Sequence, residues 1–228
     1  MQTKKITLLA PARNKEIAIA AIQAGADAVY IGAPQFGARY AASNSLEDIA
    51  QVVAYAHPYH VEVLVTLNTL LHDDEFEAAV SMAHDLYSIG VDALIIQDLR
   101  LLDYPLPPIR LHASTQCDNR TAQQVQYLES KGFSRVVLAR ELSLDEIRSI
   151  RHQTTIELEA FIHGALCVSY SGRCYISEVL MDRSANRGCC AQYCRMRYDL
   201  LDENMEEIKD AEGKPIHQRY LLSLQDMD

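Results

Sequence analysis

The chain of 228 residues lacks the features that would place it in or across a membrane. No apolar run approaches the roughly 20 residues that a membrane-spanning helix needs. No signal peptide is evident either, because the polar start, residues 1–5, leads directly into a short strand-like stretch. We therefore expect a cytoplasmic protein that does not contact a membrane.

The signatures of several enzyme classes are also missing. No GxGxxG fingerprint follows the first expected strand, which disfavours a nucleotide-binding Rossmann unit. The sequence contains no GxSxG elbow, HExxH helix or P-loop. A hydrolase built on this chain would have to use another arrangement of catalytic groups.

Positive charge is scarce. The 21 lysines and arginines are outnumbered by 31 acidic residues, which gives a net charge of −10. Such a balance argues against indiscriminate binding to phosphate backbones, although a local basic patch stays compatible with it. Hydrophobic residues make up 49% of the chain, which is enough for one sizeable core.

A repeated pattern predicts the fold class. Residues 25–32, 90–97 and 132–139 each begin with a glycine that can end a helix and continue into a short apolar run. Runs that are apolar on both faces are typical of buried strands in a parallel sheet. We place strands at 6–10, 28–32, 61–67, 93–97, 109–113, 135–139 and 157–163, and helices at 14–24, 45–56, 73–89, 119–131 and 143–152.

This alternation fits an open doubly wound sheet or a parallel (β/α) TIM-like barrel, and the barrel is favoured. Seven strands are one fewer than such a barrel needs, and the chain ends just after the strand-like residues 220–223. We therefore expect a barrel truncated before its last strand. Its units would occupy 1–164, followed by a Cys-rich insertion at 165–198 and, at 199–228, a polar hairpin with the start of a further strand.

Five of the six cysteines fall within 28 residues, at Cys167, Cys174, Cys189, Cys190 and Cys194. Disulfides are disfavoured in an intracellular chain. Two close pairs joined by a flexible link are typical of a thiolate site, so Cys167, Cys174, Cys190 and Cys194 would hold a [4Fe–4S] cluster or a structural zinc ion. Unligated or nucleophilic cysteines remain an alternative. Cys189 would be a spare thiol, and the isolated Cys117 a small apolar filler.

Polar residues at strand ends are the other candidates, because the active sites of parallel barrels lie at the carboxyl ends of their strands. His163 and Glu141 are predicted to handle protons. Five arginines near the cysteines form either a solvated loop or a patch for phosphate or carboxylate. Substrate-binding residues are predicted at Arg13, Arg39, Asn68, His112, Gln116 and Arg140.

One long signature carries a family resemblance. Residues 159–177 read EAFIHGALCVSYSGRCYIS, and further matching stretches are LAPAR at 9–13, FGAR at 36–39 and TLNT at 66–69. On these residues the chain resembles the collagenase-like peptidases, a family first classified as proteases of unknown catalytic type. The resemblance extends over essentially the whole chain.

The resemblance implies an RNA-modifying enzyme. Several members hold an iron–sulfur cluster through cysteines of this region, which makes Cys167, Cys174, Cys190 and Cys194 the natural ligands here. Some relatives take their fourth cysteine from beyond the final strand, where this chain has Asp228 and stops. The stretches 112–118, 139–142 and 184–188 are similar to those of members that hydroxylate a cytidine of large-subunit ribosomal RNA to 5-hydroxycytidine.

The resemblance also implies partners. Prephenate, a small organic acid, is implicated as co-substrate of the family's RNA hydroxylations. Members are much longer than this chain, so contacts with ribosomal RNA would be completed by a missing C-terminal region. Two other functions stay open: a collagenase-like peptidase, and an assembly protein whose cluster only stabilises a partner contact.

Overall fold

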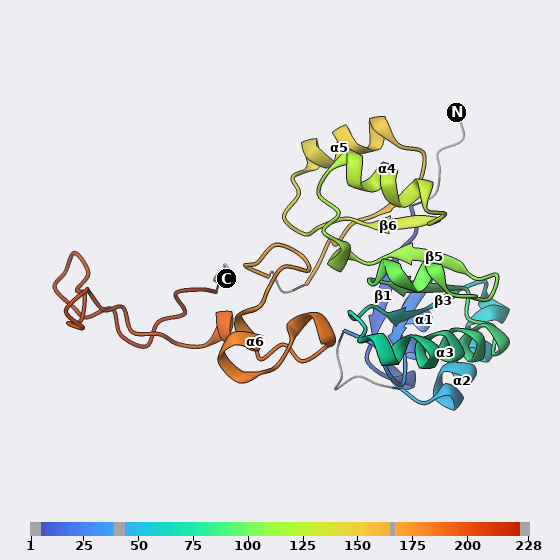
Figure 1. Ribbon diagram of the computed structural model, residues 1–228, viewed down its shortest axis with the longest axis horizontal. Helices are drawn as coiled ribbons and strands as arrows, with labels where there is room; N and C mark the ends of the chain where they lie inside the picture. Colours follow the sequence, from blue (N-terminus) through green and yellow to red (C-terminus); the bar gives the residue numbers. More distant parts are fainter. Residues whose placement is uncertain (1–5, 39–43, 165–166, 224–228) are drawn as a thin grey trace.

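The computed structural model describes residues 6–38, 44–164 and 167–223 (Figure 1). Its centre is a sheet of seven parallel strands that pair in sequence order from β1 to β7. This order is that of a (β/α) barrel, and the sheet curls as a half-barrel. The strands are β1 (Leu9–Ala12), β2 (Ala28–Gly32), β3 (Glu62–Leu67), β4 (Ala93–Ile96), β5 (Arg110–Ala113), β6 (Arg135–Val137) and β7 (Glu157–Glu159).

Helices connect the strands along the outside of the sheet (Figure 1). Helix α1 packs against α2, and α4 packs against α5. The α-helices are α1 (Lys15–Gln23), α2 (Leu46–Ala56), α3 (Phe76–Ser88), α4 (Ala122–Ser130), α5 (Leu144–Gln153) and α6 (Ile176–Met181). Short 3-10 turns are η2 (His57–Tyr59), η3 (Asp73–Glu75), η4 (Leu99–Asp103), η5 (Thr115–Cys117), η6 (Ala185–Arg187) and η7 (Tyr193–Arg195).

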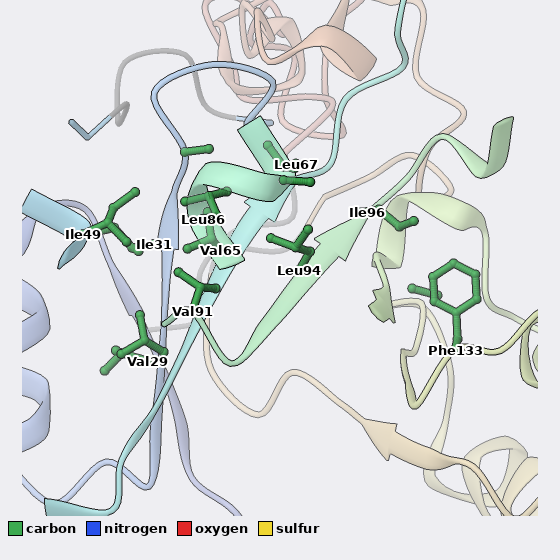
Figure 2. Packing of buried hydrophobic residues seen from close by; sticks show 14 of the residues in the cluster. Val29, Ile31, Ile49, Val65, Leu67, Leu86, Val91, Leu94, Ile96 and Phe133 are labelled. Carbon is green, nitrogen blue, oxygen red and sulfur yellow. The ribbon is translucent and has the colours of Figure 1, made fainter. Parts of the chain in front are cut away.

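The main core lies between the strands and these helices. Figure 2 shows side chains of β2, β3 and β4, such as Ile31, Val65 and Leu94, facing Ile49 of α2 and Leu86 of α3. Alternate residues of the same strands point to the inner face of the half-barrel, where Ala28, Leu64, Ala93 and Ile95 form a second, smaller cluster. Burial on both faces explains the apolar runs in the sequence.

Helix starts are fixed by the residues that the sequence indicated. The side chains of Asn14, Ser45 and Ser143 accept hydrogen bonds from backbone N–H groups in the first turns of α1, α2 and α5. Ser143 and Glu146 form a capping box. Each of these helices therefore begins at a defined residue in the loop after a strand.

Three predicted elements differ from the structure. Strand β1 starts at Leu9 rather than residue 6, and β7 ends at Glu159 rather than 163. The side chains of Phe161 and Ile162 are 48% and 87% exposed, so their apolar character does not reflect a buried strand. Residues 220–223 form a turn rather than a strand, and Arg219 beside them pairs antiparallel with Tyr198.

In the described residues after 198, up to 223, the strand pairing consists of isolated antiparallel bridges, such as Leu201 with Glu207 and Lys209 with Pro215. In Figure 1 they extend away from the half-barrel. Within the described ranges, no helix is both long enough and apolar enough to span a membrane.

Candidate cysteine site at the barrel mouth

The cysteine-bearing segment follows β7 and returns across the carboxyl ends of the strands. It contains little regular structure besides α6, η6 and η7. Hydrogen bonds join it to the loops after β3, β5 and β6, through Leu70, Gln116 and Glu141 respectively. The segment therefore lies where parallel barrels place their active sites.

A first anchor holds the turn between Cys167 and Cys174. The Glu141 carboxylate accepts hydrogen bonds from the backbone N–H and the hydroxyl of Ser171, both at 3.2 Å. The Gln116 side-chain oxygen accepts a 3.0 Å bond from the Gly172 N–H. Gly172 has a φ of +77°, and a Cβ at this position would lie 2.0 Å from the Gln116 carbonyl oxygen. Only glycine fits this close approach.

Charged groups reinforce the same turn. Asp118 binds Arg120 and also Arg173, whose Nε lies 2.5 Å from Asp118 Oδ2. The Arg120 guanidinium stacks 4.1 Å from the centroid of the Tyr170 ring. The residues next to the Ser171–Gly172 turn are thus fixed to the loop after β5 from both sides.

A second anchor holds the chain that leads to the other cysteine pair. The Asn186 carbonyl accepts a 3.0 Å bond from the Leu70 N–H, directly after β3. Arg187 donates to both carboxylate oxygens of Glu75, at 2.9 and 2.8 Å, and to the Leu70 carbonyl at 2.6 Å. The pKa of Glu75 is lowered to about 2, chiefly by the hydrogen bonds from Arg187. The pair is therefore charged at neutral pH.

A buried hydroxyl connects the two halves of the segment. Ser177 of α6 is fully buried, and its Oγ accepts a 3.0 Å bond from the Ala191 N–H. Ala191 follows Cys190, whereas Ser177 lies three residues after Cys174. This bond joins the backbone next to Cys190 to the helix that follows Cys174, although 15 residues lie between these two cysteines in sequence.

The Cys194 thiol interacts electrostatically with three other cysteines. The pKa of the Cys194 thiol is raised, first by burial and then by the neighbouring Cys167, Cys190 and Cys174. Cys189 instead interacts electrostatically with Arg187. The pKa of Arg187 is raised chiefly by Glu75, with a smaller contribution from Cys189. These interactions link Cys194 with the other three predicted ligands, and Cys189 with Arg187.

Two inorganic centres are candidates for these thiols, a zinc ion and a [4Fe–4S] cluster. Among the residues that the structure describes, no group of three or more His, Cys, Asp or Glu side chains is arranged to hold a metal ion. A single zinc ion requires all its sulfur ligands about 2.3 Å from one point. By donor chemistry, four cysteine thiolates are the usual ligands of a [4Fe–4S] cluster.

An open cavity of about 510 Å³ adjoins the segment. Its walls come from the loop ends after β4 and β5 on one side, and on the other from Arg173 and Tyr175, which flank Cys174. Polar groups on the barrel side are Gln97, Gln116 and Asp118. A small molecule in this cavity would lie beside the first cysteine pair.

Two predicted substrate-binding residues serve other contacts. Asn68 accepts a 2.9 Å bond from the Ala38 N–H and donates to Ser114 Oγ at 3.4 Å, so it orders the loops at the mouth. Gln116 binds Gly172 as described above and also lines the cavity. Glu141, predicted to handle protons, has both carboxylate oxygens engaged by Ser171.

His112 lies deeper than a mouth residue. Its side chain is on the inner face of the half-barrel, level with Ile95 of β4 and Arg135 of β6, and is 1% exposed. Burial lowers its pKa to about 3, with smaller contributions from Arg135 and Arg110. Its Nδ1 has no hydrogen-bond partner among the described residues. His112 is therefore a neutral imidazole below the mouth.

The remaining predictions fall into three cases. Arg140 lies at the mouth, where its Nη2 donates to Ser171 Oγ at 3.3 Å, and it forms no ion pair within the described residues. Arg13 and His163 are exposed, and neither side chain forms a hydrogen bond or ion pair within the described residues. Arg39 lies outside the described residues.

Sequence reasoning missed several residues that build this site. Ser171 and Glu75 are anchors, and Asp118 binds two arginines. Glu159 lies at the end of β7, where burial raises the pKa of its carboxyl and Arg135 only partly offsets that effect. The one signal in the sequence was the glycine after Ser171, since a backbone with positive φ favours glycine, but the partner of this turn could not be read from the sequence.

Comparison with known proteins now decides the family. A profile of Peptidase family U32 matches residues 13–228. The chain belongs to peptidase family U32. Among solved structures, the U32 peptidase Mk0906 superposes with a TM-score of 0.63 at 12% identity, over 98% of this chain and 92% of that one. At this identity the superposition supports the shared fold alone.

Two U32-related curated proteins have sequences closer to this chain. The 23S rRNA 5-hydroxycytidine C2501 synthase of Escherichia coli (strain K12) is 53% identical over 229 residues, which is 100% of this chain and 34% of that protein. The tRNA hydroxylation protein P1 of Bacillus subtilis (strain 168) is 40% identical over 202 residues, 87% of this chain and 48% of that protein. The chain thus spans between a third and a half of these relatives.

Proposed function

We propose that this U32 chain is part of an enzyme that hydroxylates a cytidine of large-subunit ribosomal RNA to 5-hydroxycytidine. The observation that carries the proposal is the 53% identity, over the whole chain, to a protein named for that reaction. A second relative, at 40% identity, is named for hydroxylation of another RNA. Because the chain covers only part of both proteins, RNA contacts would also come from regions outside it.

The proposed cofactor is a [4Fe–4S] cluster bound by Cys167, Cys174, Cys190 and Cys194. The electrostatic interaction of Cys194 with the other three thiols supports this ligand set. A cluster binds each cysteine at a different iron, so it spreads its ligands more widely than a single zinc ion does.

A bound cluster would supply one-electron chemistry, and the chain itself would hold the reactants. Hydroxylation at C5 of cytidine is a two-electron oxidation that adds oxygen, so it requires a co-substrate. A small organic acid such as prephenate would bind in the cavity beside Cys174. Arg140 does not line this cavity but contacts Ser171, next to the lining residue Gly172. It is the proposed carboxylate partner, because its guanidinium forms no ion pair within the described residues and its Nε has no hydrogen-bond partner there.

The test is complementation in a strain that lacks the full-length protein. Wild-type protein and a variant with both Cys167→Ser and Cys174→Ser are expressed to equal levels, and 5-hydroxycytidine in 23S RNA is measured by mass spectrometry. We expect modification with the wild type and none with the double variant. Unmodified RNA with the wild type would contradict the proposed reaction, and full modification with the double variant would contradict the role of the cysteines.

Peptidase activity is the second candidate, because the family name records it. A cysteine nucleophile needs a lowered thiol pKa. Here burial raises the pKa of Cys117 to about 12, and the pKa of Cys194 is raised as well. We therefore expect no cleavage of gelatin by the purified full-length protein, and cleavage that is lost in Cys167→Ala would favour the peptidase.

A further inference from the structure

We infer that Glu141 is a positioning residue that holds the Cys174 side of the cluster site through Ser171 and Gly172. This inference rests on the proposed cluster and assigns Glu141 a role different from proton transfer. Glu141 lies in the loop after β6, whereas Ser171 lies 30 residues further along the chain. Their contact is therefore a tertiary one that fixes the cysteine turn to the barrel.

Glu141 holds Ser171 through two hydrogen bonds, and we call this pair of contacts the Glu141 clamp. One Glu141 oxygen accepts the Ser171 N–H and the other accepts its hydroxyl, both at 3.2 Å. Thr115 and Arg140 also lie within hydrogen-bond distance of the Ser171 hydroxyl, at 3.4 and 3.3 Å. Ser171 is fully buried by these neighbours, so the turn has little freedom to move.

Proposed cluster ligands lie close to Ser171 on both sides in the sequence. Cys174 lies three residues after Ser171, and Cys167 lies four residues before it. Between Ser171 and Cys174, the Gly172 N–H is held by Gln116 and Arg173 is held by Asp118. Three successive residues are thus tied to the loops after β5 and β6, and the first of the three is held by Glu141. Outer contacts of this kind orient metal ligands and commonly change metal affinity by about 10–100-fold when removed.

A proton-transfer role fits the contact poorly. Both carboxylate oxygens of Glu141 already accept hydrogen bonds from Ser171, and Arg120 Nε lies 3.9 Å from Oε1. A general base needs a free oxygen within reach of the proton that it removes. A positioning role requires only that the two hydrogen bonds persist.

Two substitutions at this position separate the roles. Glu141→Gln keeps an oxygen that accepts from the Ser171 N–H and an amide that donates to its hydroxyl oxygen, but it cannot transfer protons as a carboxylate does. Glu141→Ala removes both contacts. Glu77→Ala on the exposed face of α3 serves as the matched control for the loss of one acidic side chain.

The readouts are the iron content of anaerobically purified full-length protein, the rate of iron loss to a chelator, and RNA hydroxylation. We expect Glu141→Ala to lose iron about tenfold faster than the wild type, while Glu141→Gln and Glu77→Ala stay near the wild-type rate. Hydroxylation should follow the iron content in all variants. An inactive Glu141→Gln with wild-type iron retention would overturn the inference in favour of catalysis, and so would a Glu141→Ala variant that retains iron normally.

Amide hydrogen exchange separates failure of this inference from failure of the proposed function. We expect exchange at Ser171 and Gly172 to be faster in Glu141→Ala than in Glu141→Gln, whether or not iron is bound. Wild-type protein without iron would refute the proposed cofactor while this comparison still tests the clamp. Equal exchange in the two variants would overturn the clamp itself.

Discussion

At the scale of single residues, Gly172 is the position where a side chain is least tolerable. Its φ of +77° lies in the left-handed region, and an added Cβ would come within 2.0 Å of the Gln116 carbonyl oxygen, which is backbone and cannot rotate away. The Ser171–Gly172 turn therefore depends on the absence of a side chain as much as on the hydrogen bonds around it.

We predict that Gly172→Ala detaches the cysteine turn from the barrel. Gly132→Ala is the matched control, because Gly132 has a φ of +92° but nothing within 4 Å of its added Cβ. In the control, the free energy of unfolding should fall only by the cost of a left-handed backbone at alanine, about 1–2 kcal/mol. Gly172→Ala should in addition lose bound iron after gel filtration. Equal iron in the two variants would show that the close contact is unimportant.

His112 provides a pH-dependent prediction. Its pKa is about 3 in the folded chain because of burial, below the ordinary value of 6.5. Between these two values the unfolded chain takes up a proton that the folded chain does not, so the free energy of unfolding decreases as the pH falls. The contribution of one such group is about 1.4 kcal/mol per pH unit.

Replacing His112 by leucine should remove this contribution. Urea denaturation of the wild type and of His112→Leu at pH 6.5, 5.5 and 4.5 measures the slope of the unfolding free energy with pH. We expect a shallower slope for the variant, with other titrating groups common to both. Parallel slopes would mean that His112 is protonated in the folded chain.

At the scale of elements, the loop after β3 and the η6 turn form one unit across more than 100 residues of sequence. Arg187 connects them through Glu75 and the Leu70 carbonyl. Charged hydrogen bonds of this kind are worth about 1.5–3 kcal/mol when well buried, and less when solvent reaches them. This unit holds the second cysteine pair as the Glu141 clamp holds the first.

We predict that Arg187→Ala loosens this unit. The Leu70 N–H, which donates to the Asn186 carbonyl, should exchange with deuterium about tenfold faster than in the wild type. Arg148→Ala on α5 is the control, because its ion pair with Asp145 is exposed and local. Unchanged exchange at Leu70 would indicate that the η6 turn is held by other contacts.

The elements could be predicted from local sequence signals, whereas contacts between distant loops could not. Apolar runs and the caps at Asn14, Ser45 and Ser143 predicted the order of strands and helices, because these signals are local. The end of β7 was predicted too far along the chain, since exposed apolar residues continue the pattern there. The roles of Glu141 and Gln116 depend on loops that meet from distant parts of the chain, and no local pattern encodes such contacts.

At the scale of the whole molecule, two facts bear on where RNA would bind. The net charge is −10, and the chain covers only part of its relatives. An acidic surface gives little sequence-independent attraction for phosphates. Two of the arginines near the cysteines, Arg173 and Arg187, are also neutralised by Asp118 and Glu75. We therefore expect the half-barrel to supply the cluster and the co-substrate site, with RNA affinity supplied largely elsewhere in the protein.

The central claim is that four thiols in this segment bind one inorganic cluster. Anaerobic purification of the full-length protein, followed by iron, sulfide and zinc analysis and an absorption spectrum, tests it most directly. We predict about four iron and four sulfide ions per chain for a [4Fe–4S] centre, with broad visible absorption that disappears in the Cys167→Ser and Cys174→Ser double variant. A colourless protein that contains one zinc ion per chain would contradict the account.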